Sequence, residues 1–411
     1  MEEVAKKKFI LNERQKLLLP VVMLGAFFEG YDFMLVNLVL PYVARDFGIN
    51  EQIAAYALSI IAIGTLVAFF VVRMADKIGR RPIFLFSVLF YSLFTLLTAF
   101  SPRIEIFVTL QFLGRIFLIG CWAVGYIIMS EEFDPELRGR ALALFQAAAA
   151  IGAIFPSIFL PFAALTELHW RLLYILGGVP LLVLFWGWNR LPETRRFEAL
   201  KLGKEKKEAA PGLFAVFEKP YLKYILAIMA LWFFMYLCYT SSMNFFAYRV
   251  VRELAWSESQ VGLITAVGYT LGLLGYYVTG KMLDRLGRKK TAHIIFTLGA
   301  LAVMGAFQMR EFLVVGILMI LAVFFVGSFT VICATFTNEV FPTAIRANAM
   351  AWGNNIVGRI GQIAAPALVG LLVPVIGLGN AVTALAIAPF ICIAIVALLL
   401  PETLGYRVEK D

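Results

Sequence analysis

Four charged residues lie inside long apolar stretches of the sequence, where an ionised side chain is costly. They are Glu29, Asp32, Arg115 and Arg359, against totals of 36 Lys and Arg and 27 Asp and Glu. A charge at the centre of a lipid bilayer costs roughly 2.5–3.5 kcal/mol on the insertion scale. We therefore expect these side chains to face one another, or to face a cavity that water and a solute can enter.

Glu29 and Asp32 are the candidates for carrying a proton. They are three residues apart, so in a helix their side chains share one face, about 60° from each other. Two carboxylates this close do not both ionise readily, because each negative charge disfavours the other. One of the pair is therefore predicted to accept a proton during function.

Arg115 is a candidate for binding an anion, because a guanidinium group keeps its proton in proteins. Trp122 and Tyr126 follow it on the same helical stripe and could complete a binding surface. A purely structural interpretation stays open, in which Arg115 and an acid form a static brace between two helices.

Arg359 is the second candidate for binding an anion. The residues that could line a site with it are aromatic or carry an amide: Trp352, Asn355, Gln362, Tyr236 and Tyr239. Aromatic rings and amides beside a fixed positive charge suit a small organic carboxylate. For each tyrosine, simple helix packing is an equally open interpretation.

The elements that hold these residues are long apolar segments. The chain has 411 residues, of which 61% are hydrophobic and 15% are charged, and its mean hydropathy is +0.85. Soluble domains are about 45–50% apolar and about 25% charged. This composition excludes an ordinary soluble enzyme, a disordered chain and a disulfide scaffold. Continuous apolar runs of about 20 residues indicate spanning helices rather than a barrel, so the predicted fold class is an all-α membrane protein.

Twelve such segments can be placed along the chain. They cover residues 17–40, 53–72, 82–100, 106–129, 141–165, 170–188, 221–246, 260–280, 291–308, 312–337, 347–373 and 379–400. We predict twelve transmembrane helices in two pseudo-symmetric six-helix bundles. The bundles are expected at 1–188 and 220–411, joined by a cytoplasmic central loop at 189–219.

The distribution of basic residues predicts the orientation. The two tails, the central loop and the other loops on their side hold 28 Lys and Arg, whereas the opposite loops hold 6. Cytoplasmic loops carry such an excess. Both termini are therefore expected in the cytoplasm of a multi-pass plasma-membrane protein, in the inner membrane if the source is bacterial.

The two halves repeat one set of charged motifs. RMADKIGRR at 73–81 matches KMLDRLGRK at 281–289, and Pro-Glu-Thr at 192–194 recurs at 401–403, with offsets of 208 and 209 residues. The repeated residues form a predicted cytoplasmic gate: Asp76, Gly79, Arg80, Glu131 and Arg138 in the first half, and Asp284, Gly287, Arg288, Glu339 and Arg346 in the second. The four mid-membrane charges are not repeated, which separates a duplicated framework from an asymmetric site.

The chemistry of these residue types suits a cytoplasmic gate. The glycines permit tight turns between helices. Asp76 and Asp284 could accept hydrogen bonds from amides at a neighbouring helix N-terminus. Arg80 and Arg288 could pair with the acids of their own repeats: Glu131 and Glu193, and Glu339 and Glu402.

The loop pattern Asp-x-x-Gly-Arg-[Arg/Lys] resembles the signature loop of the major facilitator superfamily. Glu29-Gly30-Tyr31-Asp32 further resembles the acid-Gly-x-acid motif of its aromatic-acid/proton symporter branch, and Arg359 resembles an intramembrane arginine of related organic-ion transporters. The resemblance implies secondary transport by alternating access, with Glu29 and Asp32 coupling protons to the substrate.

The function expected from these features is proton-coupled symport of a small organic anion, a class of carboxylates that includes aromatic ones. The alternatives are a sugar or polyol porter and an organic cation or drug exporter. We expect no enzyme activity, no cofactor, no metal site and no nucleic-acid partner. The expected partners are a small-molecule substrate, protons and the lipid bilayer, and we expect a monomer.

Overall fold

The computed structural model describes residues 11–188, 191–202 and 212–404, and throughout these ranges the regular structure is helical. The chain divides into two compact units. The first unit contains Met1–Val36 and Ile63–Glu208, and the second contains Asn37–Ala62 and Ala209–Asp411. Helices α1 and α2 are each shared between the units, because the boundaries at 36/37 and 62/63 fall inside them.

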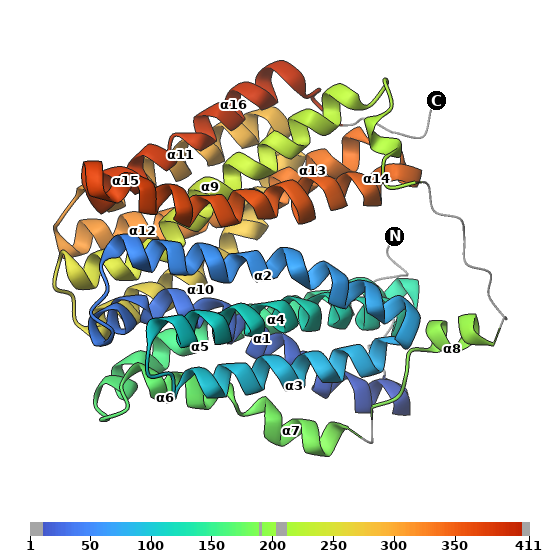
Figure 1. Ribbon diagram of the computed structural model, residues 1–411. Helices are drawn as coiled ribbons and strands as arrows, with labels where there is room; N and C mark the ends of the chain where they lie inside the picture. Colours follow the sequence, from blue (N-terminus) through green and yellow to red (C-terminus); the bar gives the residue numbers. More distant parts are fainter. Residues whose placement is uncertain (1–10, 189–190, 203–211, 405–411) are drawn as a thin grey trace. The chain divides into compact units, whose positions relative to one another are not determined.

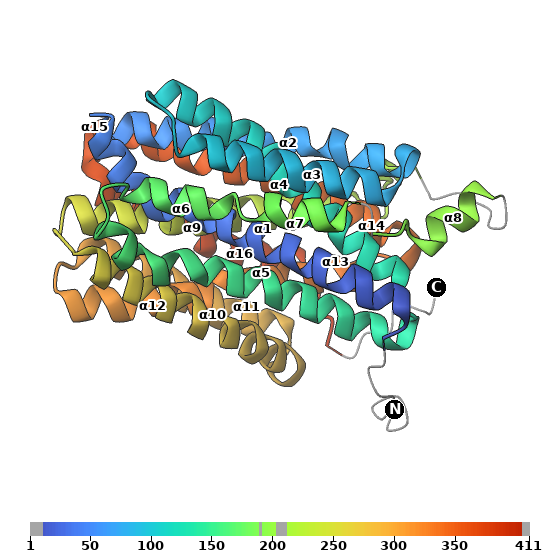
Figure 2. The same ribbon diagram turned by 90° about the horizontal axis from the view of Figure 1, so that it is seen from below.

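The described residues of the first unit form eight helices or parts of helices. They are α1 (Glu13–Asp46), α2 (Glu51–Ile78), α3 (Arg80–Thr98), α4 (Ile104–Glu132), α5 (Pro135–Ala164), α6 (Trp170–Gly177), α7 (Pro180–Gly187) and α8 (Arg195–Lys201). Helix α3 lies along α4 and also packs against α6 and α7, as Figures 1 and 2 show. These contacts bury the polar residues of α3, among them Ser87, Ser92, Thr95 and Thr98.

The second unit contains the remaining elements. They are η2 (Ala215–Phe217), α9 (Leu222–Arg252), α10 (Glu258–Leu286), α11 (Arg288–Gln308), α12 (Phe312–Gly327), α13 (Phe329–Val340), α14 (Thr343–Met350), the π-helix η3 (Ala351–Gly358), α15 (Arg359–Leu385) and α16 (Ala388–Leu399). Helix α12 packs on α10 and α11, and α9 packs on η3, α15 and α16 (Figure 2).

Ten helices in the described ranges are long and apolar enough to cross a bilayer. One of them, Thr343–Leu399, has 57 residues and bends at Gly377, whose φ is +78°. A straight helix of that length would extend about 85 Å, well beyond a hydrocarbon core of about 30 Å, so this segment provides two spans. The shorter apolar segment Trp170–Leu182 corresponds to the sixth predicted span. The prediction of an all-α membrane fold with twelve spans is confirmed.

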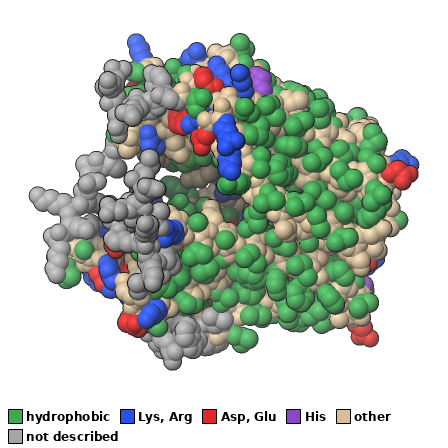
Figure 3. Space-filling view, turned by 180° about the vertical axis from the view of Figure 1, so that it is seen from behind, with side chains coloured by type: hydrophobic (Ala, Val, Ile, Leu, Met, Phe, Trp, Pro, Cys, Tyr) green, Lys and Arg blue, Asp and Glu red, His purple; other side chains and the backbone are tan. Residues whose placement is uncertain are grey.

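The surface of the molecule matches a lipid environment. Figure 3 shows hydrophobic side chains over a broad area of one face, with most charged side chains gathered along its margins. Phe70, Leu165 and Leu398 expose 67%, 86% and 77% of their surface. Apolar patches this extensive are rare on monomeric soluble proteins, so this surface suits contact with lipid tails.

Glycines allow α1 and α5 to cross with their backbones in contact. A Cβ atom on Gly30 would lie 1.9 Å from the carbonyl oxygen of Ala149, and one on Gly152 would lie 1.7 Å from that of Phe27. Real Cβ atoms do not approach carbonyl oxygens this closely. Gly30, which separates Glu29 from the next residues of the acidic motif, is therefore required for the helix crossing that holds both acids in place.

We predict that Gly30→Ala destabilises the protein by about 1–3 kcal/mol or more, because the backbones of α1 and α5 must separate. Thermal unfolding of the detergent-solubilised protein, followed by tryptophan fluorescence, measures this loss. Gly139→Ala is the matched control, since a Cβ at this exposed position of α5 meets nothing within 4 Å. Equal unfolding temperatures for the two variants would show that the crossing tolerates a side chain.

Candidate functional site

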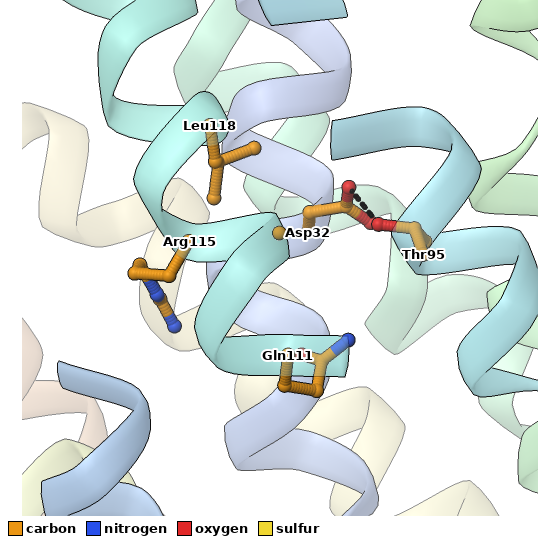
Figure 4. A pocket seen from close by; sticks show the side chains of 6 residues that line it. Asp32, Thr95, Gln111, Arg115 and Leu118 are labelled. Atoms are coloured by element: carbon orange, nitrogen blue, oxygen red, sulfur yellow. Dashed lines mark hydrogen bonds between the residues drawn. The ribbon is translucent and has the colours of Figure 1, made fainter. Parts of the chain in front are cut away.

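Asp32 lies in the interior of the first unit and is 7% exposed. Its Oδ2 accepts a hydrogen bond from Thr95 Oγ1 on α3, at 2.7 Å. Its Oδ1 is buried and has no hydrogen-bond partner in the structure. In Figure 4 the carboxylate points towards Thr95, whereas the Arg115 side chain extends in another direction. One carboxylate oxygen is thus anchored and the other is available to a proton or to water.

A small pocket adjoins this carboxylate. Its lining comes from α1, α3 and α4: Asp32, Thr95, Gln111, Gly114, Arg115 and Leu118. The volume of this cavity is about 10 Å³, which is enough for roughly one water molecule. This space is too small to enclose an organic molecule, so it suits a proton or a water molecule.

Arg115 and Glu29 are both buried in the first unit, at 9% and 8% exposure. The Arg115 guanidinium lies 4.8 Å from the ring centroid of Phe33, a cation–π contact that lowers the cost of burying the charge. The structure therefore brings Arg115 and Asp32 to one pocket. Glu29 lies three residues away on α1 and does not line it.

Trp122 and Tyr126 continue along α4 beyond the pocket. Their ring centroids are 5.8 Å apart, and Tyr126 also packs edge-on against Phe145 of α5. Trp122 is half-buried and Tyr126 is 37% exposed. The two rings form a partly open aromatic surface that is separate from the Asp32 pocket.

Arg359 lies in the second unit, at the junction between the π-helix η3 and α15. Its Nη1 donates to Gln362 Oε1 at 2.8 Å, and its guanidinium lies 5.6 Å from the ring centroid of Tyr236 on α9. Tyr236 Oη in turn donates to Asn354 Oδ1 at 3.0 Å. We call these four residues the Arg359 cluster. Within the described residues, the groups that contact the guanidinium are electrically neutral.

The π-helix explains which amide joins this cluster. An α-helical spacing of four residues predicts Asn355 beside Arg359. A π-helix closes its hydrogen bonds over five residues, so Asn354, five positions before Arg359, shares its face. Asn355 is exposed instead. Sequence periodicity could not reveal Asn354, because nothing in the residue pattern announces the change of helix type.

The remaining predicted residues of the second unit are in packing contacts. The half-buried Trp352 donates from Nε1 to the carbonyl of Leu213 at 2.9 Å, and its ring packs 5.0 Å from that of Phe217. Tyr239 packs against Phe329 at 5.6 Å. Trp352 therefore packs the start of the π-helix against η2, whereas Arg359 follows the other end of the π-helix.

A charge cluster joins the ends of α3 and α4 in the first unit. Arg80 Nε and Nη2 donate to the two carboxylate oxygens of Glu131 at 3.2 and 3.1 Å, and Nη1 donates to the carbonyl of Ala75. Thr194 Oγ1 donates to Glu131 Oε2 at 2.7 Å. This bidentate arrangement is the strong form of an arginine–carboxylate contact.

The second unit repeats this cluster atom by atom. Arg288 Nε and Nη2 donate to Glu339 at 2.9 and 2.6 Å, Nη1 donates to the carbonyl of Leu283, and Thr403 Oγ1 donates to Glu339. The predicted pairings of Arg80 with Glu131 and of Arg288 with Glu339 are present. Each cluster is formed within its own unit.

The acids at the helix N-termini differ from those expected. We expected Asp76 and Asp284 in this role, but their side chains are 55% and 79% exposed and lie beside Arg80 and Arg288 at 3.1 and 3.7 Å. Glu193 accepts from the backbone N–H groups of Arg80 and Arg81, at the start of α3. Glu402 accepts from those of Arg288 and Lys289, at the start of α11. The Pro-Glu-Thr glutamates therefore cap these helices.

The two gate glycines are required by their backbone conformation. Gly79 and Gly287 have φ of +122° and +90°, which side chains rarely adopt. A Cβ on Gly79 would also lie 2.3 Å from Glu193 Oε2. Arg138 is exposed on α5 and Arg346 is half-buried on α14, and in the described part of the chain neither forms an ion pair with its cluster.

Glu402 gives a pH-dependent contribution to stability. Partial burial alone would raise the pKa of this carboxyl, but the N–H groups of Arg288 and Lys289 outweigh it and hold the pKa of Glu402 below its usual range. A carboxylate whose pKa is lowered on folding stabilises the protein above its unfolded pKa of about 4.3 and loses that effect as the pH falls through the folded value.

We therefore predict that Glu402→Gln is less stable than the unmodified protein by about 0.3–1 kcal/mol at pH 7, and that the difference decreases as the pH falls below about 4.3 and through the lower pKa of the folded protein. Thermal unfolding in detergent across this pH range measures it. Glu167→Gln, at an exposed glutamate in the first unit, is the control. A difference that persists unchanged at acid pH would argue against the carboxylate–helix interaction.

Comparison with known proteins agrees with this architecture. The family model described as Major Facilitator Superfamily matches residues 22–251 and 233–410. The niacin transporter NiaP of Acinetobacter baylyi is 25% identical over 86% of each chain. The gentisate transporter of Corynebacterium glutamicum is 27% identical over 86% of this chain and 81% of its own.

A solved structure shares the fold. It is a bacterial homologue of the human lysosomal transporter Spinster, in an inward-facing and unoccupied conformation. It superposes with a TM-score of 0.79 at 15% sequence identity and covers 98% of this chain and 100% of its own. At this identity the match is one of fold alone.

Proposed function

The chain belongs to the Major Facilitator Superfamily, and from that premise we propose that it transports a small organic anion, coupled to protons, by alternating access. It is a multi-pass membrane transporter and not an enzyme. The proposed substrate is a carboxylate, in the first instance an aromatic one. Asp32 is proposed to carry the proton, with Glu29 as its neighbour on the same helix.

The observation that carries the proposal is the charge of Arg359. In the described part of the second unit its contacts are a tyrosine ring and a glutamine amide, and neither neutralises it. A positive charge at membrane depth costs roughly 2.5–3.5 kcal/mol unless it is compensated. An anionic substrate supplies that compensation, whereas a sugar gives only hydrogen bonds and a cation would be repelled.

The named substrates of the relatives support the same class. Niacin and gentisate are both aromatic carboxylic acids. The aromatic side chains near the two arginines, Phe33 and Tyr236, offer surfaces on which such a ring could pack. Arg115 and Arg359 are therefore proposed as anion ligands, each supported by the residues of its own unit.

The proposal also includes the arrangement in the membrane. We propose both termini and the central loop in the cytoplasm, with the two charge clusters at the cytoplasmic ends of their units. We further propose two functional halves at 1–188 and 220–411. The clusters are proposed to stiffen each half, because their bonds lie within single units.

Uptake by the purified protein in proteoliposomes tests the proposal. Radiolabelled nicotinate and gentisate are offered with the lumen more alkaline than the outside, in parallel with a hexose and a quaternary amine. We expect uptake of at least one acid, stimulated by the pH gradient and abolished by a protonophore. Liposomes without protein provide the background for passive diffusion of the protonated acids.

The same panel distinguishes the alternatives. Uptake of the hexose alone would identify a sugar porter, and movement of the amine alone would identify a cation carrier. Acid uptake that ignores both the gradient and the protonophore would retain the anion substrate and remove the proton coupling.

A further inference from the structure

We propose that the proton reaches Asp32 through the interior of the first unit, by a bound water in the Asp32 pocket and a polar passage formed by Gln111 and Thr98. The passage would leave the unit at the turn that follows α3. This inference rests on the proposed role of Asp32 as proton carrier.

The passage begins at the unpartnered oxygen of Asp32. A buried polar atom without a hydrogen bond costs about 1–3 kcal/mol. Asp32 is only 7% exposed, and its Oδ1 is such an atom. The adjoining pocket has room for one water, which normally requires two to four polar partners. Asp32, Gln111 and Arg115 supply those partners around the space.

Gln111 connects the pocket to the end of α3. It lines the pocket from α4 and is 8% exposed. Its Nε2 donates to Thr98 Oγ1 at 3.1 Å, and Ser101 Oγ donates to the carbonyl of Thr98 at 2.8 Å. Thr98 and Ser101 are fully or almost fully buried, but the next residue, Pro102, is exposed. Thr98 lies about one helical turn, roughly 5 Å, beyond the pocket residue Thr95 along α3, towards the turn that follows this helix.

The proton travels on water that enters along these side chains, because Gln111 Nε2 cannot accept a proton and Thr98 Oγ1 already donates to the carbonyl of Phe94. A hydronium at the pocket gives a proton to Asp32 Oδ1: its O–H bond breaks, the electron pair stays on the water oxygen and the new O–H bond forms on the carboxylate. Release follows the reverse course. Thr95 already donates to Oδ2, so Oδ1 is the oxygen that receives the proton.

The repeat argues that these polar residues serve function and not merely helix packing. The offset of 208 residues carries Thr95, Thr98 and Gln111 to Val303, Ala306 and Met319. Gly114 and Arg115 correspond to Ala322 and Val323. The second unit builds the same helix pair, α11 on α12, with apolar residues at every one of these positions. The polar set occurs only in the unit that contains Asp32.

The experiment measures proton access to Asp32 directly and requires no substrate. Infrared difference spectra of the full-length protein in lipid, recorded between acid and alkaline pH, contain the C=O band of the protonated Asp32, identified by its loss in Asp32→Asn. A change from H₂O to D₂O shifts this band as the carboxyl exchanges. The rate of that shift reports how readily protons reach the group.

We expect Gln111→Leu and Thr98→Val to slow this exchange by about tenfold or more, since an apolar side chain removes the polar contact. Gly114→Ala is a third variant that keeps the fold. Its Cβ would take up pocket space and meet only Phe94 Cβ at 3.5 Å, an ordinary contact. Thr109→Val, at an exposed threonine of α4, is the matched control and should exchange at the original rate.

The outcomes separate the two proposals. Exchange that is equally fast in all variants, with the Asp32 band present, would overturn the passage and leave Asp32 as proton carrier. Absence of any Asp32 band at every pH would overturn the proton role of Asp32 and the passage with it. Slow exchange in the three variants and not in Thr109→Val would support the passage.

Discussion

Asp32→Asn is expected to abolish accumulation of the organic acid against a pH gradient while exchange of labelled for unlabelled acid continues. Asparagine has nearly the shape of the protonated carboxyl and cannot take up or release a proton. The variant should therefore resemble a carrier in which residue 32 is permanently protonated. With one proton moved per anion, a gradient of one pH unit supplies about 1.4 kcal/mol and accumulates the acid about tenfold. In Asp32→Asn that ratio should fall to about one.

The structure gives the reason for choosing Asp32 over Glu29. Asp32 has one oxygen fixed by Thr95 and one oxygen that is buried and unpartnered beside a water-sized pocket. Glu29 is equally buried but lies outside the pocket lining. We expect Glu29→Gln to reduce the rate and to keep the dependence on the pH gradient.

The measurement compares gradient-driven uptake with counterflow in the same proteoliposome preparation. Counterflow controls for folding and for substrate binding, because it requires both and needs no net proton movement. Asp46→Asn, at an exposed acid near the end of α1, is the matched control. If Asp32→Asn and Glu29→Gln both accumulate the acid as the unmodified protein does, proton coupling through these residues is wrong.

The sequence was sufficient to predict the membrane fold and to single out Asp32 and Arg115 as charges within apolar helices, but not that these two line one pocket. Hydropathy detects spans because each must supply about 20 apolar residues. The same signal misses where helices end: the first predicted span is 17–40, but α1 is Glu13–Asp46. A helix continues into polar surroundings, because backbone hydrogen bonds and not lipid contact define its limits.

Residues that join a site from other helices could not be predicted in the same way. Thr95 and Gln111 lie 63 and 79 positions from Asp32, and a threonine or glutamine in an apolar helix is usually a packing residue. Only the fold brings them to one carboxylate. Their absence from the second repeat was, however, a signal present in the sequence, since the same comparison had already separated Arg115 and Arg359 from the duplicated framework.

The gate acids show a different limit. Asp76 and Glu193 are both close to the start of α3 in space, and both have the charge that a helix N-terminus attracts. Sequence proximity favoured Asp76, which lies next to the turn. The turn at Gly79, with its positive φ, leaves the first N–H groups of α3 facing Glu193, and Asp76 pairs along its own helix with Arg80.

Arg359→Ala is expected to reduce binding of the organic acid by about 100-fold or more, because it removes the charge that the carboxylate would contact at membrane depth. Truncating one member of a buried charged pair costs about 2–5 kcal/mol. Arg359→Lys keeps the charge but loses the planar fork that contacts a carboxylate through two parallel hydrogen bonds, so it should bind more weakly than arginine and better than alanine.

The neighbours of Arg359 should have smaller and graded effects. Gln362→Leu removes the bond to Nη1 and Tyr236→Phe removes the hydroxyl that holds Asn354, so each would loosen the guanidinium without deleting its charge. A positioning role predicts a loss of about 1 kcal/mol, or roughly fivefold in Kd, for each variant. The cation–π contact with the ring is retained in Tyr236→Phe.

Equilibrium binding of radiolabelled nicotinate and gentisate to the purified protein tests this order. Arg252→Ala, at an exposed arginine of α9, controls for loss of general positive charge. The order expected is alanine weakest, lysine intermediate and the two neighbour variants nearest to the unmodified protein. Full binding by a folded Arg359→Ala would mean that the carboxylate is held elsewhere. Arg115, the other proposed anion ligand, would then be the next candidate, and the anion site would be assigned to the first unit.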